Sequence, residues 1–268
     1  MRTGRTVTCA LTLAFAFGAL ACQAGSPTSV GDAAVEQPSF EVPPLDGATA
    51  GYALSFDGVR QYATAGDAYF APVGGPMTIE LWVNYAAAAN TQDFLALRTS
   101  LDNGTKSGVQ IGLHAGTLAV WRVYVDYVLV QAPTTPAAGT WHHVAYTFDA
   151  TTNVLYVDGT AVATSTLPTD SHTPTSAWLG TYDGYANMFK GALDEIRVWK
   201  AVRSASEIVS DMQHSSGQGD ADLVAYWTFD DATNVGRSAD LSGHGTDVTL
   251  GDGVAALMPL RVPSEIPF

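Results

Sequence analysis

Two groups of aromatic side chains are interleaved with polar ones near expected turns. The first group contains Trp178, Tyr182 and Tyr185, with Asp183 and Asn187 close by. Pyranose rings stack on aromatic faces, and a few polar groups beside apolar rings are the usual form of a small-ligand site. These five residues are therefore candidate ligand-binding residues. Ordinary packing on the face of a sheet is the alternative.

The second group lies earlier in the chain. Trp121, Tyr124 and Tyr127 follow one another at short spacing, with Arg122 and Asp126 between them. The same two interpretations apply, so Trp121 and Tyr124 are further candidate ligand-binding residues.

Catalytic patterns are nearly absent. The chain has no Gly-x-Ser-x-Gly elbow, His-Glu-x-x-His motif or P-loop. Glycoside hydrolysis requires two carboxyl groups that flank the scissile bond. With six Glu in the chain, the nearest local pair is Asp194 and Glu195, which as strand neighbours point to opposite faces. The adjacent His142 and His143 cannot chelate a metal together for the same reason. We predict that the protein is not an enzyme.

The N-terminus has the parts of a secretory signal peptide. Basic residues precede an apolar stretch over residues 10–21, which is short for a membrane span and ends in small residues. Residues 19–21 fit the small-x-small rule of signal cleavage. Cys22 follows at once, so the stretch also resembles a bacterial lipobox, although Ala19 stands where a lipobox usually has leucine. Lipidation at Cys22 and soluble secretion both stay open.

The cysteine content bears on whether the chain is lipidated. Cys9 lies within the signal, so the exported chain would keep Cys22 alone and form no internal disulfide. A lone thiol in an oxidising compartment favours the lipidated form.

The chain is acidic. Twelve basic residues face 26 acidic ones, and the net charge of −14 disfavours nucleic acid as a partner. Residues 23–48 are rich in Pro, Gly, Ser and Ala, which predicts a flexible tether or a disordered N-terminus.

From residue 50 onward the pattern is typical of an all-β domain. Short runs of β-branched and aromatic residues are separated by Gly, Asp, Asn and Pro. The clearest runs are residues 77–83, 108–113, 117–123, 141–148, 153–157 and 192–199. Asp158-Gly159 between two such runs predicts a tight hairpin. This many short strands indicate a sandwich or a jelly roll.

Two local patterns are more detailed. Strict alternation over residues 192–199 predicts that Leu193, Glu195, Arg197 and Trp199 share one face of a strand. Residues 204–213 form the one stretch that looks helical. Its first residue is a serine with a glutamate three positions later, which predicts a capping box.

Several segments, taken in chain order, resemble the laminin-G-like domains of the concanavalin A-like jelly-roll superfamily. They are residues 51–58, 78–83, 139–145, 155–159 and 189–199. Residues 226–230 and 240–245 resemble a further element, which in many relatives precedes the first strand. The resemblance spans residues 50–250. It implies a non-catalytic domain that binds glycans, proteins or calcium.

The resemblance also implies a structural calcium ion. In relatives, it is often held by the Asp of the opening Phe-Asp-Gly and the Asp of the closing Gly-x-x-Asp-Glu, which match Asp57 and Asp194. Calcium takes six to eight oxygens, so backbone carbonyls and water would have to complete the site. Arg60 stands where many relatives have an acidic residue, and its guanidinium could pair with Asp57 instead. A turn cap at Asp57 and an ion pair from Asp194 to Lys190 or Arg197 are the alternative.

These observations predict an all-β, concanavalin A-like jelly-roll β-sandwich of two antiparallel sheets, with one short helix. The expected division is a signal peptide over 1–21, a tether over 22–49, a domain over 50–250 that includes 220–250 as an extension, and a tail over 251–268. The expected function is a surface-displayed binding module for glycan or protein ligands, held at the membrane by a lipid only. Alternatives are a structural or adhesive envelope component without a small ligand, and a degenerate polysaccharide-degrading enzyme.

Overall fold

The computed structural model describes residues 51–66, 75–100, 106–123, 127–169, 173–214, 219–231 and 235–267. The expectations for the signal segment, Cys22, the tether and Tyr124 concern residues outside this set. Within these ranges, no helix has the length and apolar character needed to cross a membrane.

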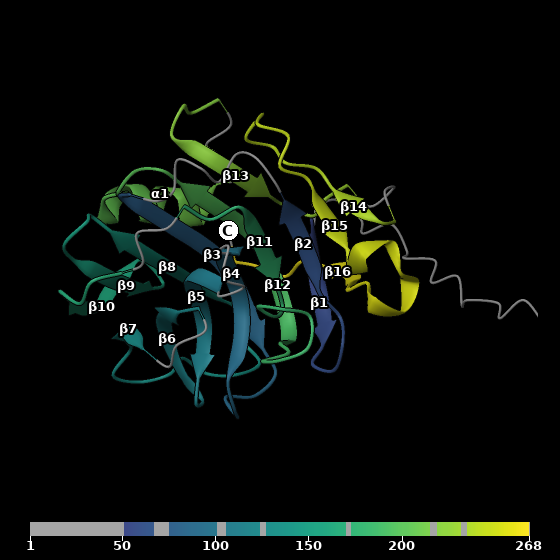
Figure 1. The fold of residues 1–268 in the computed structure, drawn as a ribbon, viewed down its shortest axis with the longest axis horizontal. Helices are drawn as coiled ribbons and strands as arrows, with labels where there is room; N and C mark the ends of the chain where they lie inside the picture. Colours follow the sequence, from purple (N-terminus) through teal and green to yellow (C-terminus); the bar gives the residue numbers. More distant parts are fainter. Residues whose placement is uncertain are drawn as a thin grey trace, which may run out of the picture. The chain divides into compact units, whose positions relative to one another are not determined.

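Two antiparallel sheets of eight strands each form the domain (Figure 1). The first sheet has the order β10 (Thr160–Ser165), β9 (Asn153–Val157), β8 (His142–Phe148), β3 (Met77–Tyr85), β12 (Lys190–Trp199), β1 (Tyr52–Asp57) and β16 (Leu260–Pro263), and β13 (Leu223–Trp227) also pairs with β12. The second has the order β14 (Arg237–Ser238), β15 (Val248–Leu250), β2 (Ala63–Gly66), β11 (Ser176–Leu179), β4 (Gln92–Ser100), β5 (Lys106–His114), β6 (Thr117–Arg122) and β7 (Val128–Gln131). The predicted fold class is confirmed.

The core lies between the two sheets. In β5, Val109, Ile111 and Leu113 belong to one apolar cluster with side chains of the first sheet such as Leu54 and Ile79. Each fully buried side chain of this size contributes about 1.5–3 kcal/mol relative to exposure. Because strand side chains alternate, the residues between them face away from the core, where a ligand could reach them.

Two local predictions are confirmed. The helix α1 (Ala205–Gln213) begins after Ser204, whose Oγ accepts a hydrogen bond from the Glu207 N–H at 3.3 Å, while Glu207 Oε2 accepts from the Ser204 N–H at 2.7 Å. The β9–β10 hairpin turns at Asp158 and Gly159, whose φ angles of 48° and 76° are typical of a tight primed turn.

The predicted alternation in β12 is wrong at Glu195. Its φ is 49°, and the register against β3 shifts between Asp194 and Arg197. Such a bulge adds one residue and moves the following side chains to the other face. Leu193 therefore lies in the core with Ile196, whereas the Arg197 guanidinium donates to Glu195 Oε2 at 2.7 Å outside it.

The C-terminal part of the chain joins both sheets (Figure 1). Strand β13 pairs with β12, β15 pairs with β2, and β16 pairs with β1 through the register Tyr52↔Pro263. The stretch 251–268, which we expected to be a tail, thus supplies an edge strand of the first sheet. The extension over 220–250 contributes strands to this same sandwich.

A buried polar pair lies on the face of the first sheet that α1 covers. Glu80 on β3 and His143 on β8 are both 0% exposed, and Glu80 Oε2 lies 3.5 Å from His143 Nε2. Burial, together with the nearby Asp211 carboxylate, raises the pKa of Glu80 to about 8 despite the opposing charges of Arg197 and Arg203. Burial lowers the pKa of His143 to about 3. Both side chains are therefore neutral near pH 7.

We expect Glu80→Gln to weaken the pH dependence of stability. Between the ordinary glutamate pKa and about 8, the folded state keeps a proton on Glu80 that the unfolded chain has lost, so stability falls as the pH rises. One such group contributes a slope of up to about 1.4 kcal/mol per pH unit. Urea melts from pH 5 to pH 8 measure this slope. The matched control is Glu265→Gln, at an exposed site. An unchanged slope in E80Q would contradict the prediction.

Candidate functional site

One tryptophan of each predicted aromatic group lies on the outer face of the second sheet. The strand registers align Trp178 of β11 with Ala96 of β4, Ala96 with Gln110 of β5, and Gln110 with Trp121 of β6. The two tryptophans therefore lie in one row across the sheet, separated by three strand spacings, or about 14 Å. Their side chains point to the same face, away from the core.

Trp121 is packed rather than open. Its ring makes an edge-to-face contact with His114 at 5.2 Å between centroids, and the residue is 4% exposed. The prediction of a surface-exposed binding aromatic is wrong for this residue. Tyr124 lies outside the described residues, and Tyr127 is 36% exposed, 5.9 Å from the Arg122 guanidinium.

Trp178 is half-buried between side chains from the strands on either side. The Tyr62 ring stacks on it at 5.6 Å with an interplanar angle of 23°, and the Arg98 guanidinium lies 4.1 Å from its ring centroid. Tyr62 precedes β2 and Arg98 belongs to β4, the two neighbours of β11. The indole thus supports the site and leaves little free face for a sugar ring.

The remaining candidates lie on one loop, residues 181–187, which follows β11. Thr181 Oγ donates to the Ala186 carbonyl at 2.7 Å and accepts from the Gly184 N–H at 3.1 Å. Asp183 Oδ1 accepts from the N–H groups of Tyr185 and Ala186, each at 2.9 Å. These bonds close two turns within seven residues, so the loop backbone is fixed without a ligand.

Tyr185 lies at the tip of this loop and is 91% exposed. Tyr182 and Asn187 are half-buried. Gly184 faces the rings beneath: a Cβ placed on it would lie 3.5 Å from Trp178 and 3.7 Å from Tyr62. The loop therefore rests on the Tyr62–Trp178 stack and holds the Tyr185 ring outward.

Sequence reasoning missed Asp93, which lies beneath the loop. Its N–H donates to the Asn187 carbonyl at 2.9 Å, and its Oδ1 accepts from Gln110 Nε2 at 2.8 Å. Burial raises the pKa of Asp93 to about 8, although the amides of Asn187 and Gln110 favour its ionised form. An acidic residue at the start of the apolar run 94–97 was the signal that could have pointed to it.

A cavity of approximately 450 Å³ adjoins the loop at Asn187. Apart from Met188, it is lined by small or polar residues: Gly58, Ala86, Ala87, Ala89, Asn90, Thr91, Gln92, Asn187 and Lys190. The Gln92 amide is already used, because its Nε2 donates to the carbonyls of Ala87 and Ala89, each at 3.0 Å. Lys190 is exposed and supplies the cavity with a positive charge.

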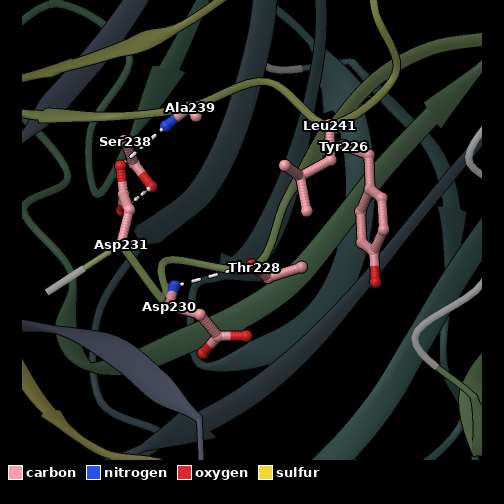
Figure 2. A pocket seen from close by; sticks show the side chains of 7 residues that line it. All are labelled: Tyr226, Thr228, Asp230, Asp231, Ser238, Ala239 and Leu241. Carbon is pink, nitrogen blue, oxygen red and sulfur yellow. Dashed lines mark hydrogen bonds between the residues drawn. The ribbon is translucent and has the colours of Figure 1, made fainter.

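A second, smaller cavity of approximately 260 Å³ lies beside β13 (Figure 2). Its two carboxylates already accept hydrogen bonds from groups of this chain. Asp231 accepts from Ser238 Oγ at 2.8 Å and from the Ala239 N–H at 3.0 Å, and Asp230 Oδ1 accepts from the Tyr52 N–H at 2.7 Å. We therefore place the candidate ligand site at loop 181–187.

The structure does not bring Asp57 and Asp194 together. Asp57 aligns with Lys190, four residues from Asp194 along β12, or roughly 13 Å. One cation cannot contact both carboxylates at that separation, so the predicted pair is wrong as a calcium site. Among the described residues, no cluster of three or more His, Cys, Asp or Glu side chains is arranged to hold a metal ion.

Each of the two carboxyl groups has a local role instead. Partial burial opposes ionisation of Asp57, but the N–H groups of Arg60, Val59 and Gln61 donate to its Oδ1 and hold its pKa below the usual range. Burial raises the pKa of Asp194 to about 8, against a hydrogen bond from Ser264 Oγ.

A His–Asp–Thr arrangement at the start of β8 does not form an activated nucleophile. His142 Nδ1 lies 2.9 Å from Asp158 Oδ2, and its Nε2 lies 2.9 Å from Thr140 Oγ. However, the Thr140 hydroxyl donates to the Ala137 carbonyl at 2.9 Å, so it can only accept from the imidazole. A base that activates a hydroxyl must receive that proton. The arrangement therefore fastens the β9–β10 hairpin to β8.

The concanavalin A-like lectin/glucanases superfamily matches residues 57–209, more than half of the chain. The chain belongs to this family. No curated protein is detectably similar to it in sequence.

Solved structures share the fold. A candidate carbohydrate-binding protein from Bacteroides ovatus has a TM-score of 0.57 at 17% identity, over 81% of this chain and 62% of that one. The present chain thus spans less than two thirds of that protein. A heptameric SAP-like pentraxin from Limulus polyphemus has a TM-score of 0.52 at 15% identity, over 80% and 100%. The CBM40 of a Ruminococcus gnavus IT-sialidase gives 0.47 at 16%, over 61% and 98%. At these identities, the likeness concerns the fold alone.

We expect Asp57→Ala to destabilise the domain equally with and without calcium. The carboxylate caps a turn by accepting three N–H groups, and loss of such a cap costs about 1 kcal/mol. This corresponds to a Tm decrease of roughly 2–4 °C for a domain of this size. Melts in calcium chloride and in EDTA measure it. The control is Asp149→Ala, which removes a similar cap on Thr151 and Thr152. A loss confined to the calcium sample would show instead that Asp57 binds the ion.

Proposed function

We propose that this protein is a non-catalytic glycan-binding module in which loop 181–187 contacts the ligand. The observation that carries the proposal is the Tyr185 ring, 91% exposed at the tip of a hydrogen-bonded loop. An exposed ring gains little from folding, whereas it can bury its face against a sugar. A loop that is already ordered loses less entropy on binding.

The cavity beside the loop supports the same proposal. Its volume of approximately 450 Å³ lies in the range of about 300–1,000 Å³ that is usual for small-ligand pockets. It shares Asn187 with the loop, so a ligand on Tyr185 could extend into it and meet polar groups. A ring that stacks and a polar recess beside it suit a short oligosaccharide.

We expect neutral glycans to be preferred over anionic ones. Asp183 belongs to the loop, Asp252 lies behind the aromatic stack, and the chain has a net charge of −14. A field of this sign repels sulfate and carboxylate groups. Two positive charges oppose this field: Lys190 on the cavity wall and Arg98 against the Trp178 ring.

Absence of turnover is part of the proposal. A glycosidase needs two accessible carboxyl groups about 5–10 Å apart. Asp194 and Glu195 are 2% and 3% exposed, and Glu195 Oε2 is engaged by the Arg197 guanidinium and by the Tyr226 hydroxyl at 2.6 Å. Asp93 is 0% exposed. None of these groups can reach a glycosidic bond without rearrangement.

We expect Tyr185→Ala to weaken glycan binding about five- to thirtyfold, because loss of an aromatic anchor costs about 1–2 kcal/mol. A glycan array with neutral and anionic oligosaccharides identifies the ligand, and calorimetry on the best binder measures Kd. Tyr185→Phe should bind nearly as tightly as the wild type. Tyr127→Ala, at an exposed tyrosine outside the loop, is the matched control.

Three outcomes would contradict the proposal. Absence of glycan binding by the wild-type protein would favour a structural or adhesive envelope component. Equal Kd values for Y185A and the wild type would place the site elsewhere. Release of oligosaccharide products from a polysaccharide panel, abolished by Glu195→Gln, would make the protein an enzyme.

We further propose that the protein is exported and held at the cell envelope by a lipid on Cys22. The apolar segment over 10–21 and the cysteine directly after it support this. Cys22→Ser removes the residue that would carry the lipid, and stable anchoring needs at least two acyl chains. The variant should therefore move from the membrane fraction to the soluble fraction. Fractionation followed by immunoblotting measures the shift. Wild-type protein in the soluble fraction would favour secretion.

A further inference from the structure

The aromatic stack beneath the loop is held by residues that lie beyond the segment matched by the family. That match ends at residue 209, whereas Tyr62 is fastened by residues 251–257. The Tyr62 N–H donates to the Leu257 carbonyl at 3.1 Å, and the Tyr62 carbonyl accepts from the Gly251 N–H at 2.9 Å. The backbone of Tyr62 is therefore held on both sides by the C-terminal segment.

Asp252 holds the Tyr62 side chain as well. Its Oδ2 accepts from the Tyr62 hydroxyl at 2.8 Å, and its Oδ1 accepts from Thr64 Oγ at 3.1 Å. The carboxylate reaches both groups from a tight turn, in which Asp252 has a φ of 50° between two glycines that also have positive φ. Burial and the Asp252 carboxylate together raise the pKa of Tyr62 to about 12, so the phenol stays a donor at all physiological pH values.

A continuous series of contacts connects Asp252 with the loop. The Tyr62 ring, fixed at its hydroxyl, stacks on Trp178 at 5.6 Å. Gly184 of loop 181–187 rests against both rings, at the point where the loop turns toward Tyr185. If Tyr62 moved, the surface on which the loop lies would move with it.

We propose that Asp252 is a positioning residue for the ligand site, acting through Tyr62 and Trp178 on loop 181–187. Where it is measured through glycan binding, this positioning role rests on the proposed function. The expected role is to keep the loop in its binding-competent arrangement, which makes the C-terminal segment part of the site although it contributes no ligand contact.

A double-mutant cycle tests the proposal. Asp252→Ala and Tyr62→Phe should each weaken glycan binding about three- to tenfold. The double variant should be no weaker than D252A alone, because Y62F removes only a hydrogen bond that D252A has already removed. Asp252→Asn keeps an acceptor oxygen for the phenol and should restore most of the affinity. The matched control is Asp222→Ala, which removes an exposed carboxylate paired with Lys200 at 3.7 Å. Additive losses in the double variant would overturn the proposal.

Hydrogen exchange provides a readout that needs no ligand. In D252A, the N–H groups of Gly184, Tyr185 and Ala186 should exchange at least severalfold faster than in the wild type, with exchange in β3 and β8 unchanged. If the wild type binds no glycan, this measurement still tests the positioning role. If glycan binding is found but both exchange and Kd are unchanged in D252A, the positioning role is wrong and the proposed function stands. Should D252A fail to fold, Y62F alone carries both measurements.

Discussion

Burial of one face of each sheet against the other is the constraint on which the rest of the structure depends. Because side chains alternate along a strand, placing Val109 and Ile111 in the core forces Gln110 to the opposite face. The same rule in neighbouring strands aligns Gln110 with Ala96 and Trp178. The row of outward side chains that ends at the candidate site therefore results from core packing. The loop after β11 rests on side chains that folding has already ordered.

Buried carboxyl groups make the net charge of the folded protein less negative than its composition suggests. Glu80, Asp93 and Asp194 all have a pKa raised to about 8, in each case mainly because burial disfavours the charged form. At pH 7, the folded protein thus carries fewer negative charges than its formal −14. Beneath loop 181–187, a neutral Asp93 adds no repulsion to that of Asp183.

Periodicity and turn chemistry were sufficient to predict the sandwich, the α1 capping box and the Asp158-Gly159 hairpin, because each depends on residues close in sequence. The same reasoning expected Tyr182 and Tyr185 to lie near turns, and both lie on loop 181–187. It failed where the outcome depends on pairing between distant strands. The bulge at Glu195 has no local signature, and it reverses the face of Leu193. The separation of Asp57 from Asp194 follows from the β1–β12 register, which sequence alone does not specify. Trp121 looked like an exposed aromatic because its contact with His114 depends on the side-chain direction across two strands.

The C-terminal segment explains why the aromatic stack can be rigid. Without β15, β2 would be an edge strand of the second sheet, and Tyr62 beside it would lie at an open margin. Pairing of Thr249 with Thr64 and of Leu250 with Ala63 makes β2 an inner strand. Asp252, two residues beyond Leu250, then reaches the Tyr62 hydroxyl from the end of β15. The segment therefore does more than cover a sheet edge. It supplies the outermost fixed contact of the series that runs through Tyr62 and Trp178 to the loop carrying Tyr185.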